Sequence, residues 1–238
     1  MTTSPGSIFK VSSQHRKSGE TPQNFSVNFD SAIPDGTYAL HELCLPVSWY
    51  NINSTNNKIV FYYYLLPRTA TIPPGYYNTS NITTAIKTAM EAAAGSGTFT
   101  VTYDSLTSKF TITHSLDIWT IVPGETGTCH SMLGFSESAQ TPATSQTSDG
   151  VVNLAYPLSI NIFIDGATST ISDSKSNPTF TVPITENSQS LMIYRPDPVY
   201  PITVKLNRMS RVSVRLLADN YQSLDMNGCD FYFMLRKL

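Results

Sequence analysis

The stretch that decides the fold is ITVKLNRMSRVSVRL, which spans residues 202–216. Apolar and polar residues alternate from Ile202 to Leu206, and they alternate again from Val212 to Leu216. An alternation with a period of two is typical of a strand that buries one face and exposes the other. This stretch therefore predicts a β-strand with a bend near its middle.

The same pattern recurs along most of the chain. Phe25–Phe29 alternates in the same way, and Phe231–Leu235 is an apolar segment that predicts a closing strand. Asp35-Gly36 and Asn227-Gly228 are strong turn signals beside these segments. Ile59–Leu65 is apolar at nearly every position, so we expect both of its faces to be covered. About eight strands without a convincing linker predict one continuous β domain.

One helix interrupts the strands. Apolar residues fall at helical spacing from Ile82 to Ala93, Thr79 or Ser80 can cap the start, and Gly95 ends the pattern. Residues 99–113 follow as a predicted hairpin. Residues 136–150 and 167–190 are polar, rich in serine and threonine, and are expected to form exposed loops of unknown role.

The composition excludes several classes of protein. Charged residues make up 13% of the 238 residues, against roughly 25% in ordinary soluble domains. The formal net charge is -2, so no basic field for sequence-specific nucleic-acid binding is expected. No apolar run reaches the ~18 residues of a membrane span, and no signal peptide is evident at the polar start of the chain. The sparse charge predicts a chain that hides much of its surface in an assembly.

Three cysteines without a CxxC spacing indicate reduced thiols in a reducing compartment. Cys44 and Cys229 lie in predicted strand regions and are expected to be buried, and Cys129 is expected to be free as well. The four histidines form none of the spacings of a zinc site. We therefore predict no enzyme, no catalytic centre, no bound metal and no cofactor.

Two groups of residues are candidates for contacts with other subunits. Residues 1–22 lack periodicity and read as an N-terminal arm, which is either a loose terminus or a segment ordered by a neighbour. Three arginines near one strand suit ion pairs with a neighbouring subunit, or phosphate contacts. The predicted interface residues are Ile8, Phe9 and Val11 of the arm, and Arg208, Arg211 and Arg215.

The aromatic block Phe61–Tyr64 leaves a choice between packing and a platform for a sugar or a base. It lies inside an apolar strand, which favours packing in a core or an interface.

The order of several motifs resembles that of the penton (minor capsid) proteins of virophages and Polinton-like viruses. LPVSWYNI at residues 45–52 is similar to their "LP-x-S-x-Y-N-I" strand. IPPGYY at residues 72–77, the helix, residues 100–113 and MLGF at 132–135 resemble their helix-and-hairpin module. Residues 212–233 are similar to their two closing strands.

The resemblance implies an all-β fold, a single jelly-roll β-sandwich of eight antiparallel strands, with residues 79–135 as a helix-plus-hairpin insertion. Residues 23–238 would form the jelly-roll domain. Its strands would be Phe25–Phe29, Tyr38–Trp49, Ile59–Leu65, a short piece near Ile72, Leu158–Ile164, Leu191–Tyr194, Ile202–Leu216 and Phe231–Leu235.

The function implied is structural: a penton protein that closes the five-fold vertices of a small icosahedral double-stranded DNA virus. Its partners would be itself as a homopentamer, double-jelly-roll major capsid protein neighbours, and other minor capsid or cement proteins. It would be located in the virion, after synthesis and assembly inside the host cell rather than secretion. The alternative is a receptor- or glycan-binding fibre or spike domain of a virus or phage.

Overall fold

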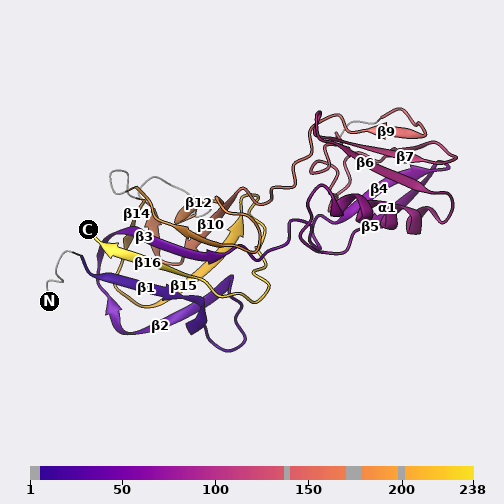
Figure 1. The fold of residues 1–238 in the computed structure, drawn as a ribbon. Helices are drawn as coiled ribbons and strands as arrows, with labels where there is room; N and C mark the ends of the chain where they lie inside the picture. The colour runs from indigo at the N-terminus through magenta and orange to yellow at the C-terminus, as the bar shows by residue number, and fades with distance from the viewer. Residues whose placement is uncertain (1–5, 137–139, 170–177, 198–201) are drawn as a thin grey trace. The chain divides into compact units, whose positions relative to one another are not determined.

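The chain folds into two compact units in a computed structural model that describes residues 6–136, 140–169, 178–197 and 202–238. The sandwich unit comprises Met1–Trp49 and Pro157–Leu238, and the inserted unit comprises Tyr50–Tyr156. Figure 1 shows the inserted unit in the purple-to-salmon middle of the chain, between strands β3 and β10.

The sandwich unit consists of two antiparallel sheets. One contains β1 (Ile8–Ser12), β16 (Tyr232–Lys237), β3 (Gly36–Pro46), β14 (Thr203–Leu206) and β11 (Ala167–Ser169) in this order, and β13 (Leu191–Tyr194) also pairs with β3. The other has the order β12 (Phe180–Pro183), β10 (Ser159–Ile164), β15 (Met209–Ala218) and β2 (Asn24–Ile33). A 3-10 turn, Ser13–His15, follows β1.

The core of the sandwich unit is formed by alternate residues of the two sheets. Phe25 meets Phe231 edge-on with ring centroids 5.7 Å apart, and Phe180 meets Phe233 at 6.5 Å. The antiparallel sandwich confirms the predicted fold class, with ten strands rather than eight in the described part of this unit. The additional strands are the short segments β1, β11 and β12, together with the division of residues 202–216 into β14 and β15.

Residues 202–216 form two strands in different sheets instead of one bent strand. β14 pairs with β3 and β11, whereas β15 pairs with β10 and β2. The chain crosses between the sheets at Asn207 and Arg208, where the backbone N–H of Arg208 donates to the carboxylate of Asp35. Both segments alternate because each buries one face in the same core.

The start of the chain differs from the predicted arm. Residues 8–12 form β1, which pairs along its whole length with the last strand, β16. Val11 is completely buried, and the ring of Phe9 lies 5.7 Å from the ring of Tyr38. The sequence pattern is too short to reveal a strand whose partner is the other end of the chain. Residues 1–5 of the predicted arm lie outside the described residues.

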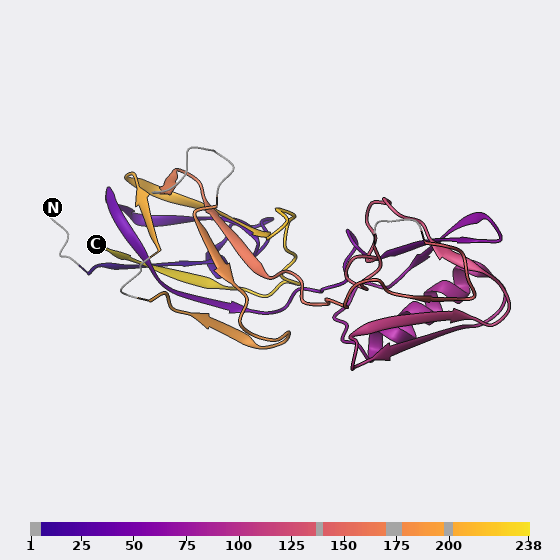
Figure 2. The same ribbon diagram turned by 90° about the horizontal axis from the view of Figure 1, so that it is seen from above.

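The inserted unit contains two small sheets and one helix. β5 (Leu66–Thr71), β4 (Lys58–Tyr63) and β8 (Trp119–Ile121) form one sheet, and β6 (Phe99–Asp104), β7 (Lys109–His114) and β9 (Ser145–Thr147) form the other. Helix α1 (Asn81–Ala94) packs against β5 and β6, and Figure 2 shows it lying against these strands. The predicted helix and hairpin are confirmed.

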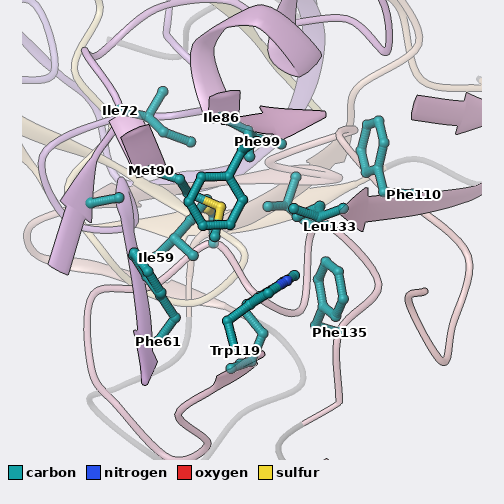
Figure 3. Close-up of a cluster of buried hydrophobic side chains, with 14 of the residues drawn as sticks. Ile59, Phe61, Ile72, Ile86, Met90, Phe99, Phe110, Trp119, Leu133 and Phe135 are labelled. Carbon is teal, nitrogen blue, oxygen red and sulfur yellow. The ribbon is translucent and has the colours of Figure 1, made fainter. Parts of the chain in front are cut away.

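One hydrophobic core holds the inserted unit together, as Figure 3 shows. Phe61, Phe99 and Trp119 meet pairwise edge-on, with ring centroids 5.9–6.3 Å apart. The helix contributes one buried stripe, the strands and the 129–135 segment supply most of the rest, and Ile52 and Ile72 complete the core. The labelled members are Ile59, Phe61, Ile72, Ile86, Met90, Phe99, Phe110, Trp119, Leu133 and Phe135.

The bounds of the insertion are therefore wider than the predicted 79–135. β4 and β5, which the prediction placed in the jelly roll, belong to the inserted unit because their apolar face packs into its core. The other face of β4 is only partly covered, since Tyr62 is 41% exposed. An apolar pattern identifies a strand but does not identify the sheet that receives it.

The start of α1 is also capped differently from the prediction. The Oδ1 atom of Asn78 accepts the backbone N–H groups of Ser80 and Asn81, each at 2.9 Å. No cap is formed by the side chain of Ser80. Gly95 ends the helix with a φ of 76°, as expected for a glycine in the left-handed region.

Candidate assembly and binding surfaces

In the described part of the chain, no group of three or more metal-ligating side chains could hold a metal ion. No described helix is long and apolar enough to span a membrane.

The predicted interface residues of the N-terminal segment have different environments. Ile8 is 50% exposed, and its side chain is available to a partner. Phe9 packs on Tyr38, and Val11 has no exposed surface, so the prediction that Val11 docks on a neighbour is wrong for the folded chain. An interface role for Ile8 stays a prediction.

The three predicted arginines are all exposed, and the side chains of Arg211 and Arg215 contact residues of their own chain. The Nη2 group of Arg211 donates to the Ser26 hydroxyl at 3.0 Å. The guanidinium of Arg215 lies over the Phe163 ring, 5.1 Å from its centroid. Arg208 holds Asp35 through its backbone. Whether these side chains also meet a neighbouring subunit stays a prediction.

The cysteines are free, as predicted, and two of the three are buried. Burial raises the pKa of the Cys129 thiol to about 12. Cys229 is exposed, which corrects the prediction that it lies buried in a strand. It follows Asn227-Gly228 in the turn before β16, so its side chain lies outside the sheet.

An ion-paired network crosses the six-stranded sheet of the sandwich unit. Glu42 on β3 accepts from Arg195 Nε at 2.9 Å and from the Tyr232 hydroxyl of β16 at 2.9 Å. Lys10 of β1 lies 4.1 Å from the centre of the Tyr232 ring. The guanidinium of Arg195, followed by the Tyr232 hydroxyl, holds the pKa of Glu42 below its usual range.

Next to this network, Leu191 and Ile193 of β13 are 56% and 51% exposed. Two branched apolar side chains on one strand of a sheet are a surface that association with another chain would cover.

The inserted unit contains a strained turn that the sequence did not reveal. Tyr64 and Leu65 form the two-residue connection between β4 and β5, with φ angles of 50° and 60°. Turns of this kind normally use asparagine or glycine, because other side chains are strained at positive φ. Tyr64 is nevertheless 61% exposed and Leu65 is 86% exposed.

A carboxylate, Asp117, lies beside this turn. Its Oδ2 atom accepts from the Tyr63 hydroxyl at 2.8 Å, and that hydroxyl lies 3.0 Å from Ser96 Oγ. Hydrogen bonds from Tyr64 and then Tyr63 lower the pKa of Asp117, and the same contact raises the pKa of Tyr64 to about 12. The buried His114 supports the loop, because its Nδ1 accepts the backbone N–H of Asp117 at 2.9 Å.

These residues border a groove of about 280 Å³ on the inserted unit. The strand register explains why these residues lie together. β4 lies between β5 and β8, so the end of β4 is next to the start of β8. The lining residues are Tyr62, Tyr64, Leu65, Asp117, Ile118, Trp119, Thr120 and Pro142. The run of tyrosines at 62–64 is the one sequence signal that points here.

No protein-family model and no curated protein matches the sequence. Among solved structures, the mavirus penton protein is similar with a TM-score of 0.54 and 9% identity, over 97% of this chain and 99% of that chain. A chain of the Sputnik virophage structure matches at a TM-score of 0.46 and 11% identity, over 99% and 98% of the two chains. The first likeness shows that this chain has the fold of a virophage penton protein along nearly its whole length.

Proposed function

We propose that this protein is a structural capsid component, the penton protein that closes the five-fold vertices of a small icosahedral double-stranded DNA virus. The observation that carries the proposal is the shared fold with the mavirus penton protein over 97% of the chain. Because the likeness extends beyond the sandwich unit, it distinguishes this chain from the many unrelated proteins that contain a jelly roll.

The surface of the sandwich unit supports an assembly role. Closing a ring of five requires a heterologous interface, in which one patch of a subunit meets a different patch of its neighbour. Exposed Leu191, Ile193 and Ile8 provide apolar area on the six-stranded sheet, and only 13% of the chain is charged. Such a surface suits burial against copies of this chain and against major capsid protein neighbours in the virion, without a catalytic role.

The test is the symmetry of the assembled protein. We expect pentamers of the purified chain in mass photometry, or five-fold density at the vertices of particles formed with the major capsid protein. The double variant Leu191→Asp/Ile193→Asp should reduce assembly, because it places charge on that face. The matched control is Leu106→Asp, at a residue that is 92% exposed in the inserted unit. A stable trimer would instead favour the fibre or spike alternative.

A further inference from the structure

We propose that the groove on the inserted unit binds an arginine side chain presented by a partner protein. The groove bordered by Tyr62, Tyr64 and Asp117 is made of aromatic and aliphatic side chains around one carboxylate. This inference does not depend on the vertex function, since all of the lining residues belong to the inserted unit.

The turn beside the groove combines a strained backbone with exposed apolar side chains. Two consecutive non-glycine residues adopt positive φ, at 50° and 60°. Ile118, which also lines the groove, is 56% exposed, and Leu65 is 86% exposed. Strained backbone and clustered exposed apolar side chains both cost stability or solubility, so their coincidence marks a binding surface.

The charge of the groove is negative. Asp117 is its one charged lining residue, and hydrogen bonds from two tyrosine hydroxyls favour the ionised carboxylate. Transferring an ionised carboxylate into hydrocarbon is strongly unfavourable, which argues against insertion of this turn into a lipid bilayer. An anionic ligand is disfavoured as well, because the Asp117 carboxylate would repel it and no lysine or arginine lines the groove.

The hydrogen-bonding groups of the lining fit a cation better than a sugar. Sugar hydroxyls need both acceptors and donors, and the lining contains no amide, guanidinium or ammonium group. Two of its donors are already engaged: Trp119 Nε1 donates to the carbonyl of Thr144, and the Thr120 hydroxyl donates to the carbonyl of Gln140. The Tyr62 hydroxyl and the Asp117 carboxylate remain beside the tyrosine rings, and a carboxylate next to aromatic rings suits a cation.

The geometry of the lining favours arginine over lysine. A guanidinium is planar, stacks on aromatic rings and donates to a carboxylate through two N–H groups, and it is more weakly hydrated than an ammonium. A carboxylate has about four lone-pair positions, and the Tyr63 hydroxyl, 2.8 Å from Asp117 Oδ2, uses one of them. Asp117 therefore keeps the capacity to accept from one guanidinium edge.

The test uses the unassembled, isotope-labelled full chain and two blocked amino acids, N-acetyl-arginine methylamide and its neutral isostere N-acetyl-citrulline methylamide. We expect the arginine probe to shift the amide resonances of Leu65 and Thr120, with a dissociation constant on the order of 1 mM. The citrulline probe should bind at least about tenfold more weakly, since it lacks the charge.

Matched variants locate the site. Asp117→Asn should weaken binding of the arginine probe by about tenfold or more, whereas Asp104→Asn, at an exposed carboxylate of the same unit, should not. Leu65→Lys adds a repelling charge at a side chain that is 86% exposed, so it tests the site without disturbing the core. Its control is Leu106→Lys at the tip of the β6–β7 hairpin.

Several outcomes would overturn the proposal. Equal affinity for the citrulline probe would show that charge is not recognised, and shifts confined to other residues would place the site elsewhere. Binding of neutral monosaccharides to the same amides without arginine binding would assign the groove to a sugar. Co-sedimentation with phosphatidylcholine vesicles that Leu65→Lys abolishes, again without arginine binding, would assign it to a lipid surface.

Discussion

Replacing Gly134 with alanine should destabilise the inserted unit by about 4 kcal/mol. Gly134 has a φ of 81°, and an added Cβ atom would lie 2.4 Å from the carbonyl oxygen of Gly150. That oxygen belongs to the backbone and cannot rotate away. The two segments must separate, and the hydrogen bond from the Gly150 N–H to the Gly134 carbonyl, now 2.8 Å, would be lost.

The magnitude combines three effects. The left-handed backbone costs a non-glycine residue about 1–2 kcal/mol. A lost backbone hydrogen bond costs about 1 kcal/mol, and the shift needed to relieve the overlap costs about 1–3 kcal/mol. Gly124→Ala is the matched control: its φ is 73° and nothing lies within 4 Å of the added atom, so about 1–2 kcal/mol is expected.

Urea unfolding followed by tryptophan fluorescence measures both variants. The chain has two tryptophans, so a Trp49→Phe background leaves Trp119, in the core of the inserted unit, as the reporter. The comparison is valid where the slope against urea is unchanged. If Gly134→Ala and Gly124→Ala differ by less than about 0.5 kcal/mol, the close approach of the two backbone segments is wrong.

Four further predictions concern other parts of the chain. Asn51→Ala should destabilise the inserted unit by about 2–4 kcal/mol in the same urea assay, because it removes the hydrogen bonds of a buried side chain to the backbone of Tyr77 and Leu154; no change would refute that role. Deleting residues 1–12 should lower the unfolding free energy of the sandwich unit by at least about 2 kcal/mol, since β1 and its buried side chain are removed, whereas an arm outside the core could be deleted without effect. A thiol reagent should modify Cys229 rapidly in the native chain and Cys129 only after unfolding, as mass spectrometry of the labelled peptides would show. The lowered pKa of Asp117 implies that its ionised carboxylate stabilises the folded chain at pH values above the ordinary pKa of 3.8. This contribution is lost as the pH falls through the folded-state pKa. Asp117→Asn should therefore reduce the loss of unfolding free energy at acid pH, as urea unfolding at several pH values would show.

The strands could be predicted from the sequence more securely than their partners. Alternation at Ile202–Leu206 and Val212–Leu216 follows from one buried face, so both strands were identified, but not their separation into two sheets. β4 was likewise recognised as a strand and assigned to the jelly roll, although its neighbours are β5 and β8. Sheet membership depends on contacts between distant residues, and a local pattern contains no information about them.

The groove could not be predicted from the sequence, for two reasons. The turn at Tyr64-Leu65 lacks the asparagine or glycine that signals such a turn, so the sequence there reads as an uninterrupted strand. Asp117 and Tyr63, which are joined by a hydrogen bond, lie 54 positions apart in the sequence. The interface prediction at Val11 failed for a related reason, because its partner strand is the last one in the chain.

Asn51 has a consequence for how such a chain can evolve. Its Nδ2 group donates to the carbonyls of Tyr77 at 2.8 Å and Leu154 at 2.9 Å, and its Oδ1 accepts the N–H of Tyr77 at 2.8 Å. One side chain thereby ties the first residues of the inserted unit to its last ones. A segment whose two ends are fastened together can be exchanged for another of different length or sequence while the β3 and β10 strands keep their pairings. Grafting residues 50–156 into a surface loop of an unrelated protein would show whether this region folds independently of the sandwich unit.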